Sequence, residues 1–251
     1  MSGHSKWSTI KRAKGVTDQK RGALFSRLSR ELSIAARTGG ADPAMNVRLR
    51  LIIQKARDVN MPADNINRAV QRGAGGADGA NLVELTLEGY GPGGVAIMVA
   101  ALSDNRNRTV QEVRNILTRH GGSLAESGAV AWQFDSRGVI TVETPTPDEA
   151  ALEAIDAGAE DVKEEKGFIE IYTTPHDLEK VRRALEAKKM KITSADFTLV
   201  PRSTTMVDER TAIQNVKLLD NLEELEDVRY VNTNLDYSEE VLEKLKVSGL
   251  V

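Results

Sequence analysis

The chain has 251 residues, a formal net charge of −3 and no cysteine, which excludes disulfides, thiolate metal sites and cysteine nucleophiles. Its three histidines lie far apart in the sequence and show no metal-ligand spacing, so we expect no metal site and no cofactor. No apolar run reaches the roughly 20 residues that span a bilayer, and the N-terminus lacks the apolar middle region of a secretory signal. We therefore expect a cytoplasmic protein of two or three domains with no membrane partner.

The charges are distributed unevenly along the chain. Residues 1–80 carry 15 Lys and Arg against 6 Asp and Glu, a net charge of +9, whereas the other 171 residues carry 19 against 31, a net charge of −12. Such asymmetry is typical of a polyanion-binding module joined to an acidic body. A solvated helical surface is the alternative, and charge alone leaves both open.

Residues 1–80 are predicted to form a basic helical domain. Leu24, Leu28 and Leu32 recur at every fourth position, which predicts a helix over residues 17–38 with one apolar and one cationic side. Asp42 followed by Pro43 predicts the start of a second helix, which runs to about residue 59. A third helix is predicted from residue 62 to Gly73, before the glycine-rich linker RGAGGADGA.

After residue 81 the pattern changes to β-branched stretches with intervening helices, which predicts an α+β fold. Residues 138–200 read strand, helix, strand, strand, helix, strand, the order of a ferredoxin-like plait. The stretch AVAWQF is predicted to be a strand with Trp132 in the core. We expect three domains: a three-helix domain over 1–80, an α+β domain made of 81–135 plus 204–251, and the plait inserted between them as 136–203.

Two loops, one rich in glycine and one containing two arginines, are candidates for phosphate binding. EGYGPGG, residues 88–94, lies between two predicted strands and is predicted to be a hairpin turn. SDNRNRT, residues 103–109, follows a strand and precedes a helix, which predicts a helix cap, with phosphate contacts by Arg106 and Arg108 as the alternative. The sequence contains no recognisable catalytic constellation, so we do not expect an enzyme.

The N-terminal stretch GHSKWSTIKRAKGVTDQKRG, residues 3–22, holds six Lys and Arg against one acid. Cations in such an arm neutralise backbone phosphates and release counterions, and an indole among them can stack on a base. The cationic side of the first predicted helix extends the same surface. We therefore predict a nucleic-acid contact set of His4, Lys6, Trp7, Lys11, Arg12, Lys14, Lys20, Arg21, Arg27, Arg30 and Arg37.

Several motifs together resemble the YebC family over essentially the whole chain. They are GHSKW at 3–7, KRG at 20–22, NMP at 60–62, NRAVQRG at 67–73, EGYGPGG at 88–94, SDNRNRT at 103–109 and DAGAED at 156–161. That family includes bacterial proteins described as transcriptional regulators and mitochondrial translational activators of cytochrome oxidase. The resemblance implies a helical domain followed by two α+β domains, one inserted in the other, and a non-enzymatic cytoplasmic protein associated with nucleic acid.

The residues leave open which nucleic acid is the partner. A DNA-binding transcriptional regulator is the first hypothesis, although no helix-turn-helix with a polar recognition helix is identifiable. A translational activator that binds RNA or the ribosome is the alternative, and stacking by Trp7 on looped or single-stranded RNA suits it. An enzyme is the remote third hypothesis.

Overall fold

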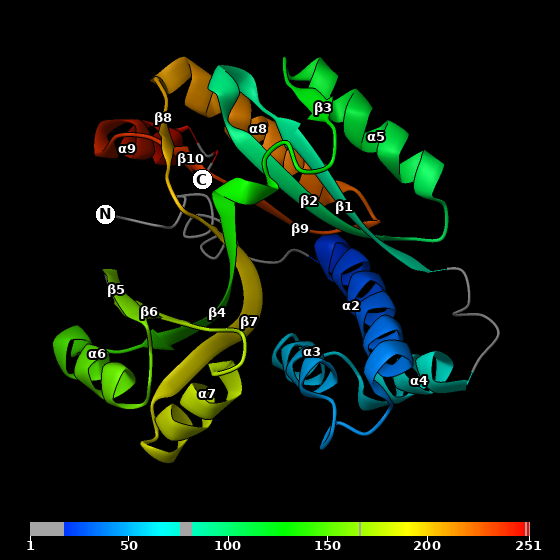
Figure 1. Ribbon diagram of the computed structural model, residues 1–251, viewed down its shortest axis with the longest axis vertical. Coiled ribbons are helices and arrows are strands. Elements are labelled where there is room, and N and C mark those ends of the chain that lie inside the picture. The colour runs from blue at the N-terminus through cyan, green and yellow to red at the C-terminus, as the bar shows by residue number, and fades with distance from the viewer. Residues whose placement is uncertain (1–17, 76–81, 166, 249, 251) are drawn as a thin grey trace. The chain divides into compact units, whose positions relative to one another are not determined.

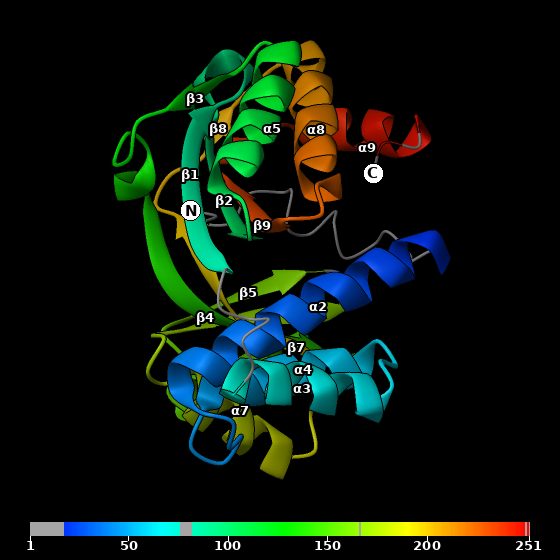
Figure 2. The same cartoon turned by 90° about the vertical axis from the view of Figure 1, so that its right-hand side faces the viewer.

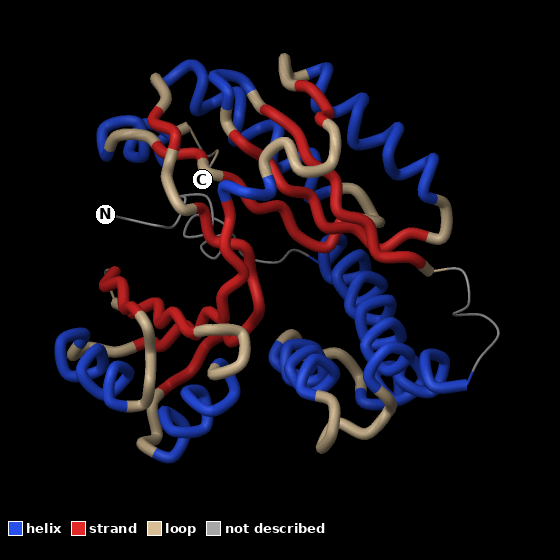
Figure 3. The backbone as a smooth tube through the Cα atoms, in the orientation of Figure 1, coloured by secondary structure: helices blue, strands red, loops and turns tan. Residues whose placement is uncertain are grey.

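The computed structural model describes residues 18–75, 82–165, 167–248 and 250. The chain divides into two compact units, of which the first comprises Met1–Phe134 and Pro201–Val251 and the second is the inserted segment Asp135–Val200. Figure 1 shows the elements of both units, and Figure 3 shows which parts of the backbone are helix, strand and loop. Each unit is described below by itself.

Three helices form the N-terminal part of the first unit: α2 (Asp18–Gly39), α3 (Val47–Asp58) and α4 (Ala63–Gly75). Their apolar sides share one core, in which Leu28, Leu32 and Leu49 are almost fully buried. α2 and α4 pack closely because Gly73 has no side chain: a Cβ there would lie 2.1 Å from the backbone oxygen of Ser33. The predicted three-helix domain is therefore observed, and its tightest contact depends on a glycine that the sequence suggested only as a helix end.

The second helix begins later than predicted. Asp42 does not cap α3; its Oδ1 accepts a hydrogen bond from the backbone N–H of Ala44 at 2.8 Å and closes a turn instead. The N-cap is Asn46, whose Oδ1 accepts from Leu49 N at 3.0 Å. The Asn46 amide also donates to the backbone oxygens of Ala35 and Gly40, at 2.8 and 2.7 Å. An amide satisfies donors and acceptors on both helices, whereas a carboxylate only accepts, which explains why Asn46 holds this position.

An antiparallel sheet in the order β3-β1-β2-β9 forms the rest of the first unit. Its strands are β1 (Val83–Tyr90), β2 (Ala96–Ser103), β3 (Ser123–Ala125) and β9 (Val228–Thr233). α5 (Arg106–Arg119) and α8 (Glu209–Glu224) lie side by side over one face of this sheet (Figure 2). A short parallel pair, β8 (Thr205–Met206) with β10 (Leu235–Asp236), and α9 (Glu239–Val247) complete the unit.

The loop EGYGPGG is the hairpin turn that the sequence predicts. β1 and β2 pair antiparallel up to Tyr90 opposite Ala96, and a single 3₁₀ turn, Pro92–Gly94, joins them. Gly93 has a φ of 76°, which a residue with a side chain rarely adopts. The glycines therefore serve the backbone of the turn.

The second unit is the predicted ferredoxin-like plait. Its elements run β4 (Phe134–Glu143), α6 (Pro147–Asp156), β5 (Asp161–Glu165), β6 (Phe168–Thr173), α7 (Leu178–Ala187) and β7 (Lys191–Pro201). The strand order β5-β6-β4-β7 is the order that the β-α-β-β-α-β sequence pattern implies. Together with the helical domain and the sheet of the first unit, this confirms the predicted α+β fold class.

The stretch AVAWQF departs from prediction. It forms a 3₁₀ turn, Ala131–Gln133, before β4 begins, and Trp132 is 67% exposed instead of lying in the core. Val130 and Phe134 point inward, so the apolar residues of this stretch do not share one face as they would in a strand. The indole Nε1 donates to the backbone oxygen of Ala129 at 3.1 Å, which holds the ring against its own loop.

A buried carboxylate imposes this turn. Glu88 on β1 is 5% exposed and accepts three backbone hydrogen bonds, from Gly128 at 2.6 Å, Val130 at 2.7 Å and Ala131 at 2.9 Å. Burial by itself would raise the pKa of Glu88, but the three N–H donors outweigh it and hold the pKa below its ordinary value. Glu88 is thus the anchor of the Trp132 loop.

We predict that Glu88→Gln loosens this loop and destabilises the first unit by about 1–3 kcal/mol, because an amide cannot accept all three backbone N–H groups. Amide hydrogen exchange of residues 126–133 should accelerate, and the urea midpoint should fall. Glu143→Gln is the control: this exposed carboxylate forms an ion pair with Lys191, 2.8 Å away, and its loss should cost less than about 1 kcal/mol. Equal effects of the two substitutions would contradict the anchor role.

Candidate functional site

The structure places only part of the predicted contact set. His4, Lys6, Trp7, Lys11, Arg12 and Lys14 lie outside the described residues, and so do the side chains of Lys20 and Arg21, whose backbone belongs to α2. Arg27, Arg30 and Arg37 are described, and all three lie on α2. Their role in nucleic-acid binding stays a prediction, but each has a partner inside the first unit.

Arg27 and Arg37 donate to backbone oxygens outside the helical domain. Arg27 Nη2 lies 2.8 Å from the oxygen of Glu223 at the end of α8, and Arg37 Nη2 lies 2.5 Å from the oxygen of Leu82 before β1. Burial lowers the pKa of Arg27, although the carboxylates of Glu223 and Glu31 oppose this effect. Both guanidiniums therefore tie α2 to the sheet domain.

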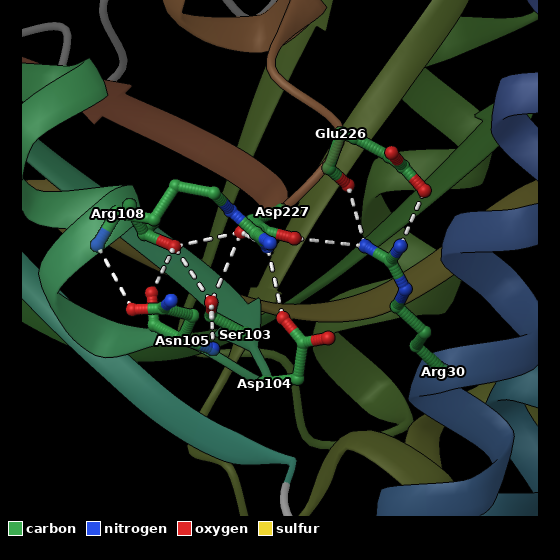
Figure 4. Close-up of polar contacts among 8 residues, drawn as sticks. Arg30, Ser103, Asp104, Asn105, Arg108, Glu226 and Asp227 are labelled. Atoms are coloured by element: carbon green, nitrogen blue, oxygen red, sulfur yellow. Dashed lines mark hydrogen bonds and ion pairs between the residues drawn. The ribbon is translucent and has the colours of Figure 1, made fainter.

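Arg30 is part of a larger cluster around Asp227, which lies in the turn between α8 and β9 (Figure 4). Asp227 is 4% exposed and its Oδ1 accepts from Arg30 Nη1 at 3.0 Å. Its Oδ2 accepts from Arg108 Nη2 and Thr109 Oγ1, each at 2.7 Å, and from Ser103 Oγ at 3.0 Å. We call these five residues, Arg30, Ser103, Arg108, Thr109 and Asp227, the Asp227 network.

The Asp227 network explains what the motif SDNRNRT does in the fold. Ser103 ends β2, Asn105 caps α5 by accepting from Arg108 N at 3.1 Å, and Thr109 Oγ1, which donates to Asp227, lies 2.7 Å from Ser103 Oγ. The predicted helix cap is confirmed. Arg108 is committed to Asp227 and to Asp104, whose Oδ1 lies 2.9 Å from Arg108 Nη2, so that its guanidinium already faces two carboxylates.

Electrostatics keep Asp227 ionised despite its burial. Desolvation alone would raise its pKa, but hydrogen bonds from Arg108, Thr109 and Ser103, together with the charge of Arg108, hold the pKa below its ordinary value. No local sequence pattern marks Asp227 as a functional or structural residue. The only sequence signal was indirect: a motif rich in hydroxyl and guanidinium donors beside a strand end implies an acceptor somewhere else in the chain.

A second group of ion pairs joins the same two domains. Arg229 on β9 has its Nη2 3.3 Å from Glu31 Oε2 of α2 and its Nη1 3.5 Å from Glu84 Oε1 of β1. Arg48 of α3 also pairs with Glu84. Glu31 is 5% exposed, so this carboxylate is buried against its partner. Ion pairs thus contribute to the contact between the helices and the sheet of the first unit.

The described residues contain nothing that suggests catalysis or metal binding. No group of three or more His, Asp or Glu side chains in that part of the chain could hold a metal ion. No helix that the structure describes is long and apolar enough to cross a membrane. The described surface does carry exposed cations and amides, and one such group lies on α5.

Two family models match the chain. One, for the TACO1/YebC protein N-terminal domain, matches residues 5–76, and the other, for the TACO1/YebC second and third domain, matches residues 82–235. A protein of Dehalococcoides mccartyi strain BAV1 called "Probable transcriptional regulatory protein" is 56% identical over 246 residues, 97% of this chain and 98% of that protein. A protein of Halothermothrix orenii with the same name is 48% identical over 250 residues, 98% of this chain and 99% of that protein.

A solved structure is also similar. The crystal structure of a conserved hypothetical protein from Aquifex aeolicus superimposes with a TM-score of 0.88 at 45% sequence identity, covering 95% of this chain and 99% of that one. The likeness extends over the helical, sheet and plait domains together. The resemblance that the motifs suggested is confirmed.

We predict that Asp227→Asn destabilises the first unit by roughly 3 kcal/mol, because it leaves two arginines without their buried counter-charge. Asp104→Asn is the matched control: it removes another carboxylate from Arg108, but this one is exposed, and the loss should stay below about 1 kcal/mol. Urea denaturation of both variants checks the difference. An Asp227 variant as mild as the Asp104 variant would show that the network contributes little.

Because the pKa values of Asp227 and Glu88 are lowered in the fold, we predict that the free energy of unfolding decreases at acidic pH. Both groups are ionised in the folded and unfolded chain above their ordinary values of 3.8 and 4.5, so their full contribution is present there. As the pH falls below these values, the unfolded chain takes up protons first, and stability is lost down to the folded-state pKa. The urea midpoint should be level from about pH 7 to about pH 5 and then fall, less steeply in Asp227→Asn than in the wild type.

Proposed function

The chain belongs to the TACO1/YebC family, and from this we propose that it is a nucleic-acid-binding regulator of gene expression that acts in the cytoplasm as a DNA-binding transcriptional regulator. The names of relatives that are about half identical to it over nearly its full length support the regulatory role. We further propose that it is not an enzyme and that regulation depends on binding alone.

The single observation that carries this proposal is the segregation of charge. The first 80 residues have a net charge of +9 and the rest a net charge of −12. Within the plait, residues 147–165 hold eight acids and one lysine, which would repel a phosphate backbone. Residues 1–80 therefore attract a polyanion, and residues 147–165 repel it.

The contacts of the α2 arginines reduce the number of predicted cations that are available to a nucleic acid. Because Arg27, Arg30 and Arg37 already bind groups within the first unit, a phosphate would have to compete with those partners. The other predicted cations are the more N-terminal ones, which the sequence gathers within residues 6–21. We assign the main phosphate contacts to Lys6, Lys11, Arg12, Lys14, Lys20 and Arg21, with His4 and Trp7 beside them.

RNA binding with translational activation is the second candidate function. It is favoured by Trp7, which stands directly after Lys6 and outside any apolar pattern. An indole flanked by cations stacks on unpaired bases, which are more common in looped RNA than in duplex DNA. The family name itself covers both kinds of protein, so the partner must be decided by experiment.

We expect duplex DNA binding whose logarithmic affinity falls linearly with the logarithm of salt concentration, by about 0.9 for each phosphate neutralised. Replacing Lys6, Lys11, Arg12 and Lys14 by alanine should reduce that slope by about 3 to 4. Fluorescence anisotropy over a series of salt concentrations measures this slope. Replacing four cations of the plait, Lys180, Arg183, Lys188 and Lys191, is the control and should leave the slope unchanged.

Competition between duplex DNA and structured RNA at physiological salt separates the two candidates. Preferential retention of RNA would refute the transcriptional version and favour the translational one. An unchanged slope in the N-terminal variant would rule out the arm as the contact surface.

A further inference from the structure

The outward face of α5 is polar and cationic. Thr109, Val113 and Leu117 are buried against the sheet and α8. The opposite side is exposed over the full length of the helix. It carries Asn107, Gln111, Arg114, Asn115, Thr118 and Arg119. Arg106, in the first turn, is also exposed, although it lies on the side of Thr109 and Val113. We call these seven residues the α5 face.

The arginines of the α5 face differ from Arg108. Arg108 turns inward to the buried Asp227, whereas Arg106, Arg114 and Arg119 are exposed and form no ion pair with any residue that the structure describes. The only acid in α5 is Glu112, which is half-buried. Three arginines on one helix without counter-charges attract an anion that can be contacted at several points, as a phosphate backbone can.

The amides of the α5 face form a row. Asn107, Gln111 and Asn115 are spaced four residues apart, so their side chains lie one above the other, and Arg119 ends the same row. At about 100° per residue this row lies roughly 160° from the buried row of Thr109, Val113 and Leu117 and so projects furthest outward. Gln111 Nε2 donates to Asn115 Oδ1 at 3.1 Å, a contact that both side chains can exchange for other partners.

This combination of side chains has a defined recognition chemistry. Asn and Gln amides form paired hydrogen bonds with the exposed edge of adenine, and Arg forms them with guanine or contacts phosphate. The major groove of B-DNA, about 12 Å wide, admits a helix, whereas the deep major groove of an RNA duplex is too narrow. A helix of 14 residues is about 21 Å long and can follow the groove over several base pairs.

We propose that the α5 face is a base-reading surface for the major groove of duplex DNA, with Asn107, Gln111 and Asn115 at base edges and Arg106, Arg114 and Arg119 at phosphates or guanine. The proposal rests on the proposed function insofar as the chain must bind DNA, and it adds a second surface with a different task. The N-terminal arm supplies attraction, and the α5 face supplies the choice of sequence.

The fold holds this face in a fixed orientation. Asn105 caps the helix, and Thr109 and Arg108 attach its first turn to Asp227, so that the backbone of α5 is tied to β2, α8 and α2 at one point. A surface that is ordered before binding loses less entropy on binding than a flexible one. The exposed side chains can then be exchanged without disturbing the core.

The first test separates phosphate contacts from base contacts. A preferred duplex is first selected from a random DNA library with the wild-type full chain. Arg106→Gln, Arg114→Gln and Arg119→Gln should each lower the salt slope by up to about 0.9, and Arg210→Gln, an exposed arginine of α8, should not. Thermal unfolding confirms that the variants remain folded.

The second test addresses sequence choice. Asn107→Ala, Gln111→Ala and Asn115→Ala should each weaken binding to the selected duplex roughly tenfold while leaving the salt slope and binding to scrambled DNA unchanged. Gln214→Ala, an exposed amide of α8, is the matched control and should bind like the wild type. Loss of preference without loss of slope is the signature that a merely charged surface cannot produce.

The outcomes distinguish this inference from the proposed function. If the wild type shows no salt-dependent binding to nucleic acid, the proposed function fails and the inference falls with it. If the wild type binds DNA but the library yields no preferred sequence, or if the α5 variants behave like the α8 controls, the inference alone is refuted. α5 variants that weaken only RNA binding would overturn the assignment to the DNA groove.

Discussion

The first unit depends on one buried charge, the carboxylate of Asp227. Removing such a charge from water costs several kcal/mol, which only a complete set of donors can offset. Here two arginines and two hydroxyls supply that set, and they come from α2, the end of β2 and the start of α5. Because all four donors must be in place together, the network fixes the helical domain, the sheet and α5 relative to one another within this unit (Figure 4).

This arrangement gives the arginines of α2 a structural role. Viewed as a sequence, Arg27, Arg30 and Arg37 continue the basic N-terminal stretch and look like one surface for phosphate. In the fold they bind backbone oxygens and a buried carboxylate, and Arg229 forms the reciprocal pair with Glu31. Along the first 80 residues, arginines of α2 therefore attach the helical domain to the sheet, whereas polyanion attraction is the role that we propose for the more N-terminal cations.

The sequence predicted those features that depend on local periodicity and turn chemistry. The apolar spacing of α2, the glycine turn between β1 and β2 and the cap at Asn105 follow from residues within a few positions of each other. The order of the plait strands follows from the succession of such local elements over residues 138–200. The sequence did not predict the features that are determined by a residue far away in the chain. Trp132 is exposed because Glu88, more than 40 positions earlier, draws Gly128, Val130 and Ala131 into a turn. Asp227 has no local signal, since its donors lie up to 197 positions away.

One side of α5 packs in the core, and the opposite side is the surface that we propose to read DNA. With 3.6 residues per turn, placing Thr109, Val113 and Leu117 inward leaves the row of Asn107, Gln111 and Asn115 almost directly opposite, whatever side chains stand there. Packing therefore determines which positions are exposed but not their chemistry. A leucine at one of these exposed positions would place apolar surface in water. A lysine or a glutamate would be solvated as well as an amide is. Three amides in one row, flanked by arginines that form no ion pair with a described residue, are thus not required by the fold, and the proposed base recognition is a use that accounts for them.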